Sequence, residues 1–176
     1  RRHTRYPLVT GVQTCALPIY ENMLSKTMSA AVLGVEAWTI TIEVNLTEGL
    51  GYNLVGLPDN AVKESMHRIE SALHECGFMM PRRKVVINLA PADVRKEGSA
   101  FDLPLALCLL SVSEQIGEVD ISNCFIMGEL SLDGSVMPVK GVLSMALLAK
   151  KTGVHSIFVP MANAREASIV SGLDVY

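Results

Sequence analysis

The chain has 176 residues, of which 49% are apolar and only 5% aromatic, and its formal net charge is −3. This composition excludes an intrinsically disordered chain and predicts one compact domain with an aliphatic core. No apolar run reaches the roughly 18 residues that a membrane span needs, so we expect a soluble, cytoplasmic protein with no membrane partner.

The first 22 residues show neither helical nor strand periodicity, and Pro7 and Pro18 interrupt the candidate elements. The string VTGVQTCALPI, residues 9–19, resembles the conceptual translation of a sequencing adapter. We therefore expect residues 1–22 to be a non-native or disordered leader, and the domain to begin at about Met23. Without the leader the chain loses three arginines and one glutamate, so the remainder is more acidic than the whole.

Residues 27–46 are rich in β-forming side chains. Within them, apolar residues alternate strictly with polar ones, which predicts a strand with one buried face. The predicted buried positions are Trp38, Ile40, Ile42, Val44 and Leu46. The string YNLVGL, residues 52–57, predicts another short strand.

A helix is predicted to follow Pro58-Asp59-Asn60, because an Asp or Asn side chain accepts hydrogen bonds from the free amides of a first turn. Apolar residues then recur at spacings of three and four, so they share one face. These residues are Val62, Met66, Ile69, Leu73 and Cys76. Gly77 is well placed to end the helix in a left-handed conformation.

The string KVVINL, residues 84–89, predicts a buried strand, and a polar connection follows to about residue 98. Residues 101–112 are apolar almost all round, which predicts a helix packed inside the domain. Two residues compete to cap it. Ser99 fits a capping box, whereas Pro104 in the first turn favours Asp102, which we prefer.

The last third of the chain predicts a hairpin around Asp133-Gly134, a helix over 141–151 and a strand over 156–159. A further helix over 162–171 and the beginning of a strand at LDVY follow. Alternation of strands and helices with a hairpin between them predicts an α/β or α+β fold with a mixed sheet packed with helices.

The sequence offers no metal site. Its cysteines form no C-x-x-C pair and have no histidine at zinc-ligand spacing, so buried reduced thiols are the better interpretation. The four cysteines are Cys15, Cys76, Cys108 and Cys124.

Three long stretches, residues 55–73, 85–107 and 128–154, occur in the order expected for one family. Together they resemble the N-terminal, Lon-protease-like (ChlI-type) module of the YifB/ComM family of bacterial magnesium-chelatase-like AAA+ ATPases. The resemblance extends from about Met23 to Tyr176. It implies the fold shared by the Lon protease domain and by domain 2 of ribosomal protein S5.

The same resemblance implies that residues 23–176 are an incomplete Lon-protease-like domain, and that an AAA+ motor domain follows downstream. That motor would bind ATP and Mg²⁺ and assemble a homo-oligomer, a hexamer. For ComM-like members the resemblance implies DNA branch migration in recombination and natural transformation. On this interpretation the chain itself is not an enzyme, although its full-length parent is an ATPase.

A Lon-like peptidase needs a serine nucleophile and a lysine base within hydrogen-bond reach. When residues 95–102 are aligned with the Lon serine loop, the nucleophile position falls on Ala100, with Ser99 one residue early. In the same way the base position falls on Leu143, and Lys140 is about three positions away. We therefore predict no catalytic residues, and keep a Ser/Lys peptidase as an alternative.

A nucleotide site of the Walker A type requires G-x-x-x-x-G-K-[ST], and this string does not occur. The nearest stretch, residues 134–141, lacks the second glycine and the hydroxyl residue. We predict no cofactor bound by this part of the protein.

The positive charges concentrate in two short runs, which are the candidate contacts to DNA or to a partner protein. They are Arg82, Arg83, Lys84, Arg95 and Lys96. The competing interpretation is two solvated basic loops, and it predicts that the five side chains are dispersed. A second function from another class, a motor subunit that drives magnesium into a porphyrin, also stays open.

Overall fold

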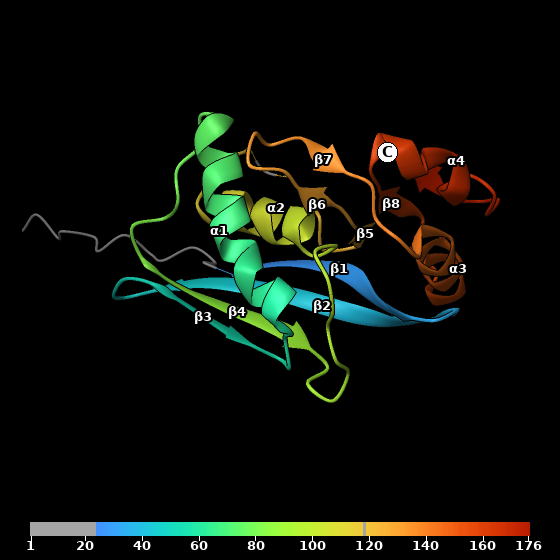
Figure 1. The fold of residues 1–176 in the computed structure, drawn as a ribbon, viewed down its shortest axis with the longest axis horizontal. Coiled ribbons are helices and arrows are strands. Elements are labelled where there is room, and N and C mark those ends of the chain that lie inside the picture. Colours follow the sequence, from blue (N-terminus) through green and yellow to red (C-terminus); the bar gives the residue numbers. More distant parts are fainter. Residues whose placement is uncertain (1–23, 118) are drawn as a thin grey trace, which may run out of the picture.

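The computed structural model describes residues 24–117 and 119–176, so the predicted leader lies outside the described part. Its centre is a seven-stranded sheet in the order β3-β4-β2-β1-β5-β8-β9 (Figure 1). Strands β4, β2 and β1 are antiparallel neighbours, and the other pairs are parallel. The mixed sheet confirms the predicted fold class. The strands are β1 (Leu24–Leu33), β2 (Glu36–Thr47), β3 (Tyr52–Val55), β4 (Lys84–Ala90), β5 (Cys124–Ile126), β8 (Ser156–Phe158) and β9 (Asp174–Val175).

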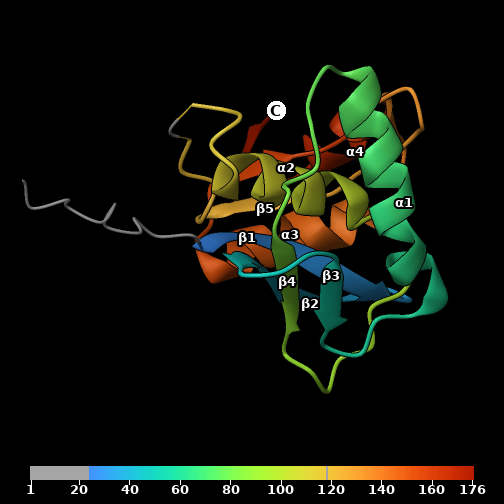
Figure 2. The same ribbon diagram turned by 90° about the vertical axis from the view of Figure 1, so that its left-hand side faces the viewer.

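Helices cover both faces of the sheet. The helices are α1 (Asn60–Glu75), α2 (Asp102–Val112), α3 (Val142–Thr152), the 3-10 turn η1 (Met161–Asn163) and α4 (Ala164–Ala167). Figure 2 shows α2 stacked over β1 and β2 with α1 beside it. The consecutive β1 residues Ala31 and Ala30 belong to separate hydrophobic clusters, one with α1 and α2 and the other with α3 and α4. Because neighbouring side chains of a strand point to opposite faces, the sheet separates two cores.

Strand β2 follows the predicted alternation except at one end. Ile40, Ile42 and Val44 are fully buried beneath the helices. Trp38, predicted to be buried with them, is 52% exposed. Its position lies past the cover of the helices and against the loop that contains Asp93, where a hollow remains. The prediction was therefore wrong for Trp38.

Helix α1 begins and ends as predicted. The Asp59 side chain accepts a hydrogen bond from the Val62 amide at 2.8 Å, which is a standard N-cap. Gly77 has φ +82°, and the next amide, that of Phe78, donates to the Leu73 carbonyl at 2.8 Å. This closes the helix as a Schellman motif. Cys76, expected on the buried face, is exposed at the cap.

Helix α2 is buried as predicted, but both cap predictions were wrong. The residue before the helix is Phe101, and no side chain caps the first turn. Asp102 is the first helical residue, and its carboxylate accepts bonds from other elements instead. The Ser99 hydroxyl likewise donates to Glu129 rather than accepting from the helix.

The predicted hairpin is present as β6 (Glu129–Leu130) and β7 (Val136–Met137), which pair antiparallel. The Asp133 carboxylate accepts from the Ser135 amide at 2.9 Å and shapes the turn. The apolar run that precedes it is split, because β5 joins the main sheet before β6 begins. The predicted helix over 162–171 is shorter than expected and consists of η1 and α4.

Candidate site at the start of helix α2

The segment that enters α2 is held by the beginning of α1. One Asp59 carboxylate oxygen caps α1, and the other accepts from the Gly98 amide at 3.1 Å. The Asp59 amide donates in turn to the Lys96 carbonyl at 3.0 Å. A single aspartate therefore fixes both the start of one helix and the loop that leads into the next.

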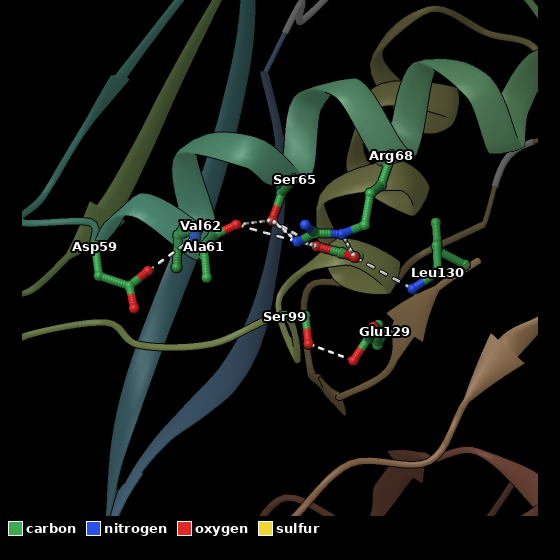
Figure 3. Close-up of polar contacts among 9 residues, drawn as sticks. Asp59, Ala61, Val62, Ser65, Arg68, Ser99, Glu129 and Leu130 are labelled. Atoms are coloured by element: carbon green, nitrogen blue, oxygen red, sulfur yellow. Dashed lines mark hydrogen bonds and ion pairs between the residues drawn. The ribbon is translucent and has the colours of Figure 1, made fainter. Parts of the chain in front are cut away.

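A buried carboxylate joins three elements one turn further on. Asp102 is completely buried, and its oxygens accept from Ser65 Oγ at 2.5 Å and from Arg68 Nε at 2.7 Å. The Leu130 amide of β6 adds a third element at 3.2 Å (Figure 3). The hydrogen bonds to Asp102 raise the pKa of Arg68 above its ordinary value. Asp102 thus ties α1, α2 and the β6–β7 hairpin together.

Beside this network the Ser99 hydroxyl donates a short hydrogen bond to Glu129 Oε2 (Figure 3). Both residues line a cavity of about 330 Å³, and Lys140 lines the same cavity from the turn before α3. Lys140 is exposed and has no hydrogen-bond or ion-pair partner within the described ranges. Ser99, Glu129 and Lys140 therefore line one hollow, and of the three only Ser99 and Glu129 are hydrogen-bonded to each other.

The opposite side of that hollow is held by the C-terminal helices. Asn163 accepts from the Val139 amide at 3.0 Å and donates to the Val139 carbonyl at 2.9 Å. Glu166 accepts from the Leu143 amide at 2.9 Å. Because Gly141 stands at the N-cap of α3 and has no side chain, Glu166 supplies the cap from a neighbouring element.

This geometry argues against the alternative that the chain is a Ser/Lys peptidase. Ser99 and Lys140 do face one cavity, but the serine proton is directed to a carboxylate, which is a far weaker base than a neutral amine. At the aligned catalytic positions, Ala100 has no nucleophile and Leu143 has no base, and the Leu143 amide serves as a helix end. The arrangement lacks the serine–lysine hydrogen bond that would activate a nucleophile.

The five predicted basic contacts do not form one cluster. Arg82 and Arg83 precede β4 and Lys84 begins it, whereas Arg95 follows its other end and pairs with Glu97 at 2.9 Å. The seven residues of β4, roughly 20 Å of chain, lie between Arg83 and the second run.

Lys96 is a correction to the predicted contact set. It is fully buried, its ammonium group donates to the Pro91 carbonyl, and burial lowers its pKa. The Lys96 side chain therefore cannot contact DNA or a partner protein at the surface. DNA contact by Arg82, Arg83, Lys84 and Arg95 stays a prediction.

Within residues 24–117 and 119–176 no group of three or more His, Cys, Asp or Glu side chains is arranged to hold a metal ion. In the same ranges no helix has the length and apolarity to cross a membrane.

Sequence reasoning missed the Asp102 network and the Asn163 and Glu166 clamp. The sequence did contain a sign of the Asp102 network. Ser65 and Arg68 are three residues apart on α1, so they share a face, and Asp102 is the one charged residue in an apolar run. No local pattern indicated the clamp, since Asn163 is 24 residues from the backbone it binds.

The mixed sheet, covered by helices on both faces, defines an α/β module. A family model described as subunit ChlI of Mg-chelatase matches residues 42–163. The chain therefore belongs to the ChlI, magnesium-chelatase-like family that includes YifB and ComM.

Similar proteins come from several bacteria. The chain is 42% identical over 153 residues to an uncharacterized protein of Mycobacterium tuberculosis, covering 86% of this chain and 30% of that protein. It is 42% identical over 150 residues to the uncharacterized protein YifB of Escherichia coli, covering 85% of this chain and 29% of YifB. It is 41% identical over 149 residues to the competence protein ComM of Haemophilus influenzae, covering 84% of this chain and 29% of ComM.

A more distant similarity is to the Lon protease of Mycolicibacterium smegmatis, 27% identical over 157 residues, covering 82% of this chain and 20% of that protein. It is consistent with the Lon-like fold. The chain spans about 30% of the length of the YifB, ComM and mycobacterial relatives.

Proposed function

We propose that residues 24–176 form a non-catalytic module of a magnesium-chelatase-like AAA+ ATPase. The observation that carries the proposal is the Ser99 hydroxyl, which donates to Glu129 instead of to a lysine amine. The hydrogen bonds to Asp102 support an assembly or substrate-gating role, because they hold α1, α2 and the β6–β7 hairpin in one arrangement.

In the whole protein, ATP and Mg²⁺ are bound by a motor domain outside the described residues, and that motor assembles a hexamer. The chain spans about 30% of its relatives, and it contains no Walker A string, which supports this division of labour. The work done by the motor is DNA branch migration in recombination and transformation. The name of the Haemophilus influenzae relative, a competence protein, supports that function.

A second candidate is magnesium insertion into a porphyrin, which the ChlI family description favours. One pair of assays on the full-length protein separates the two candidates. We expect ATP-dependent conversion of a synthetic four-way DNA junction and no magnesium protoporphyrin. The reverse pattern would assign the protein to chelation, and ATP-independent junction binding without conversion would contradict the motor proposal.

The division of labour has a separate test on the 176-residue chain alone. Isothermal titration calorimetry with ATP and Mg²⁺ is expected to give no binding heat. Micromolar ATP affinity of this chain would place the nucleotide site here and contradict the proposal.

A further inference from the structure

Strand β3 forms an open margin of the main sheet. Figure 1 shows it as the outermost strand beyond β4, its parallel partner, and no strand of the described residues pairs with its other side. The strand is accessible, since Tyr52 and Val55 are 44% and 49% exposed, Asn53 between them is exposed and Leu54 is half-buried. Such an edge presents unpaired backbone groups to a further strand.

The hydrogen bonds to β4 identify which backbone groups are unpaired. The Gly51 carbonyl accepts from the Val85 amide at 2.9 Å, so Gly51 faces β4. Successive residues of a strand direct their backbone groups to opposite sides, so Asn53 also faces β4, whereas Tyr52 and Leu54 face outwards. The N–H and C=O groups of Tyr52 and Leu54 make no hydrogen bond to any other part of the described chain.

This margin lacks the features that keep edge strands apart. Edge strands are commonly protected by a charged side chain, a proline or a bulge. Residues 49–57, GLGYNLVGL, contain no charged residue and no proline. At the two ends of the segment, Leu50 and Leu57 are 81% and 55% exposed. An uncharged, apolar margin of this kind is better explained as a contact surface than as an edge that faces water.

One side of the margin continues the hydrophobic core. Tyr52 pairs with Val85 and Leu54 with Ile87, and paired residues of neighbouring strands point to the same face. Val85 and Ile87 belong to the core that α1 and α2 cover, and Leu54 packs against it. Apolar side chains of an added strand would therefore extend this core, with Tyr52 forming an aromatic–aliphatic pair.

The other face is basic at the beginning of β3. Lys84 begins β4 and points away from α1 and α2, because the next residue lies in their core. A Cβ at Gly49 would lie 3.6 Å from Lys84 Cβ, so the Lys84 side chain lies beside the loop that leads into β3. Its ammonium group has no ion-pair partner in the described ranges. With the exposed Arg82 it outnumbers Glu48, the one acidic residue of that loop, which favours an acidic occupant.

From these observations we propose that β3 binds an extended acidic segment of a partner protein as an added antiparallel strand. Two apolar side chains of the segment pack beside Tyr52 and Leu54, and a glutamate or aspartate meets Lys84. Backbone hydrogen bonds supply affinity and the side-chain contacts supply selectivity. The site is separate from the cavity of Ser99, because no residue of β3 lines that cavity. The proposal goes beyond the role in the ATPase and does not depend on it.

The first test is a titration of the purified 176-residue chain against a capped peptide, TTLTLETT, that carries a fluorophore at its N-terminus. In the antiparallel register its leucines lie opposite Leu54 and Tyr52, and its glutamate lies opposite Gly51, beside Lys84. A second peptide has lysine in place of the glutamate. We expect a saturable rise in anisotropy with the glutamate peptide and roughly tenfold weaker binding of the lysine peptide. Equal affinities, or no saturable rise, would overturn the proposal.

Backbone pairing is tested with the protein unaltered. The amides of the two peptide leucines face β3 in the proposed register, so N-methylation of both is expected to abolish binding. N-methylation of the glutamate and of the threonine between the leucines is expected to be tolerated, because these amides face away. Tolerance of both modifications would show binding through charge alone and would exclude strand addition.

The charge contact is tested with Lys84→Gln, which we expect to weaken the glutamate peptide roughly tenfold and to leave the lysine peptide unchanged or slightly tighter. Lys151→Gln, the same change at an exposed position near the end of α3, is the matched control and is expected to have no effect. Equal affinity of the Lys84→Gln and unaltered chains for the glutamate peptide would contradict the assigned contact.

The position of the peptide is tested with two variants at residue 52. Tyr52→Pro removes an outward N–H without removing a bond to β4, and is expected to abolish binding. Tyr52→Val keeps the N–H and is expected to retain most of the affinity, and urea midpoints check that both variants are folded. Full binding by Tyr52→Pro would place the peptide elsewhere and overturn the proposal. Dimers of the unliganded chain in sedimentation that Tyr52→Pro abolishes would assign the margin to a second copy and also overturn it.

Discussion

Arg68 Nε donates to Asp102 Oδ2 at 2.7 Å, and this pair joins α1 to the first turn of α2. The Asp102 side chain is fully buried, while that of Arg68 keeps 22% of its surface exposed. The arginine head can thus stay partly hydrated while the carboxylate is satisfied by Ser65, Arg68 and the Leu130 amide.

Asp102→Ala is expected to lower the free energy of unfolding by about 3 kcal/mol, because it leaves a guanidinium and a backbone amide without their acceptor. Urea denaturation followed by circular dichroism measures this. Glu97→Ala is the control, since it breaks only the exposed Arg95–Glu97 pair and is expected to change stability by less than about 1 kcal/mol. Similar costs for the two variants would contradict the role given to Asp102.

The buried thiol of Cys108 predicts a loss of stability at alkaline pH. Burial raises the pKa of this thiol to about 12 from an ordinary value of 9.0. The pKa of Cys108 is higher in the folded chain than in the unfolded chain. Its contribution to the free energy of unfolding is therefore fully present below pH 9 and is lost as the pH rises towards 12. Between pH 9 and pH 10 the contribution of this group falls by about 1 kcal/mol.

The measurement for Cys108 compares urea midpoints at pH 8, 9 and 10 in the unaltered chain and in Cys108→Ala. The variant is expected to lose less stability over this range. Native-state alkylation at pH 8 gives an independent check, in which the exposed Cys76 reacts readily and Cys108 reacts only after unfolding. Rapid alkylation of Cys108 in the folded chain would contradict its burial.

Glycine is required at position 56 by both conformation and space. Gly56 has φ +104°, and a Cβ there would lie 2.1 Å from the Leu89 carbonyl oxygen. Gly56→Ala is therefore expected to cost about 2 to 3 kcal/mol of stability. The control, Gly34→Ala, also has a positive φ, +64°, but no atom within 4 Å, so we expect about 1 kcal/mol. Equal losses of stability in the two variants would show that the positive φ alone, and not the contact with Leu89, requires glycine at position 56.

The clamp on the turn before α3 is tested by Glu166→Ala. We expect the loss of the cap to destabilise α3 by about 1 kcal/mol and to accelerate hydrogen exchange of the Leu143 amide. The Val62 amide, held by Asp59 at the start of α1, is the internal reference and is expected to keep its protection. The Val139 amide is not a suitable reference, because Asn163, which holds it, also donates to Glu166 at 3.1 Å. Unchanged exchange at Leu143 would mean that the helix end is held by something else.

Local sequence patterns predicted most of the fold. The two-residue period of β2 and the three-and-four spacing of α1 are physical consequences of strand and helix geometry, so they are visible in the sequence. Trp38 obeys the same period and is nonetheless exposed, because the pattern does not tell where the covering helix ends.

The candidate site was less visible because its contacts are distant in sequence. The Ser99–Glu129 bond spans 30 residues and Arg68–Asp102 spans 34. Asp102 was predicted as a helix cap because capping is the local use of an aspartate, but contacts from α1 and β6 override it. Lys96 was predicted to be exposed for a similar reason, as a charge in a polar loop, yet the fold closes over it.

The most direct measurement of the central claim is reaction of the purified chain with a fluorophosphonate, followed by intact mass and peptide mapping. With the Ser99 proton directed to Glu129, we predict no adduct at Ser99 under conditions that label a serine hydrolase fully. A stoichiometric adduct at Ser99 that disappears in Lys140→Met would show a working serine–lysine pair and would contradict the non-catalytic module.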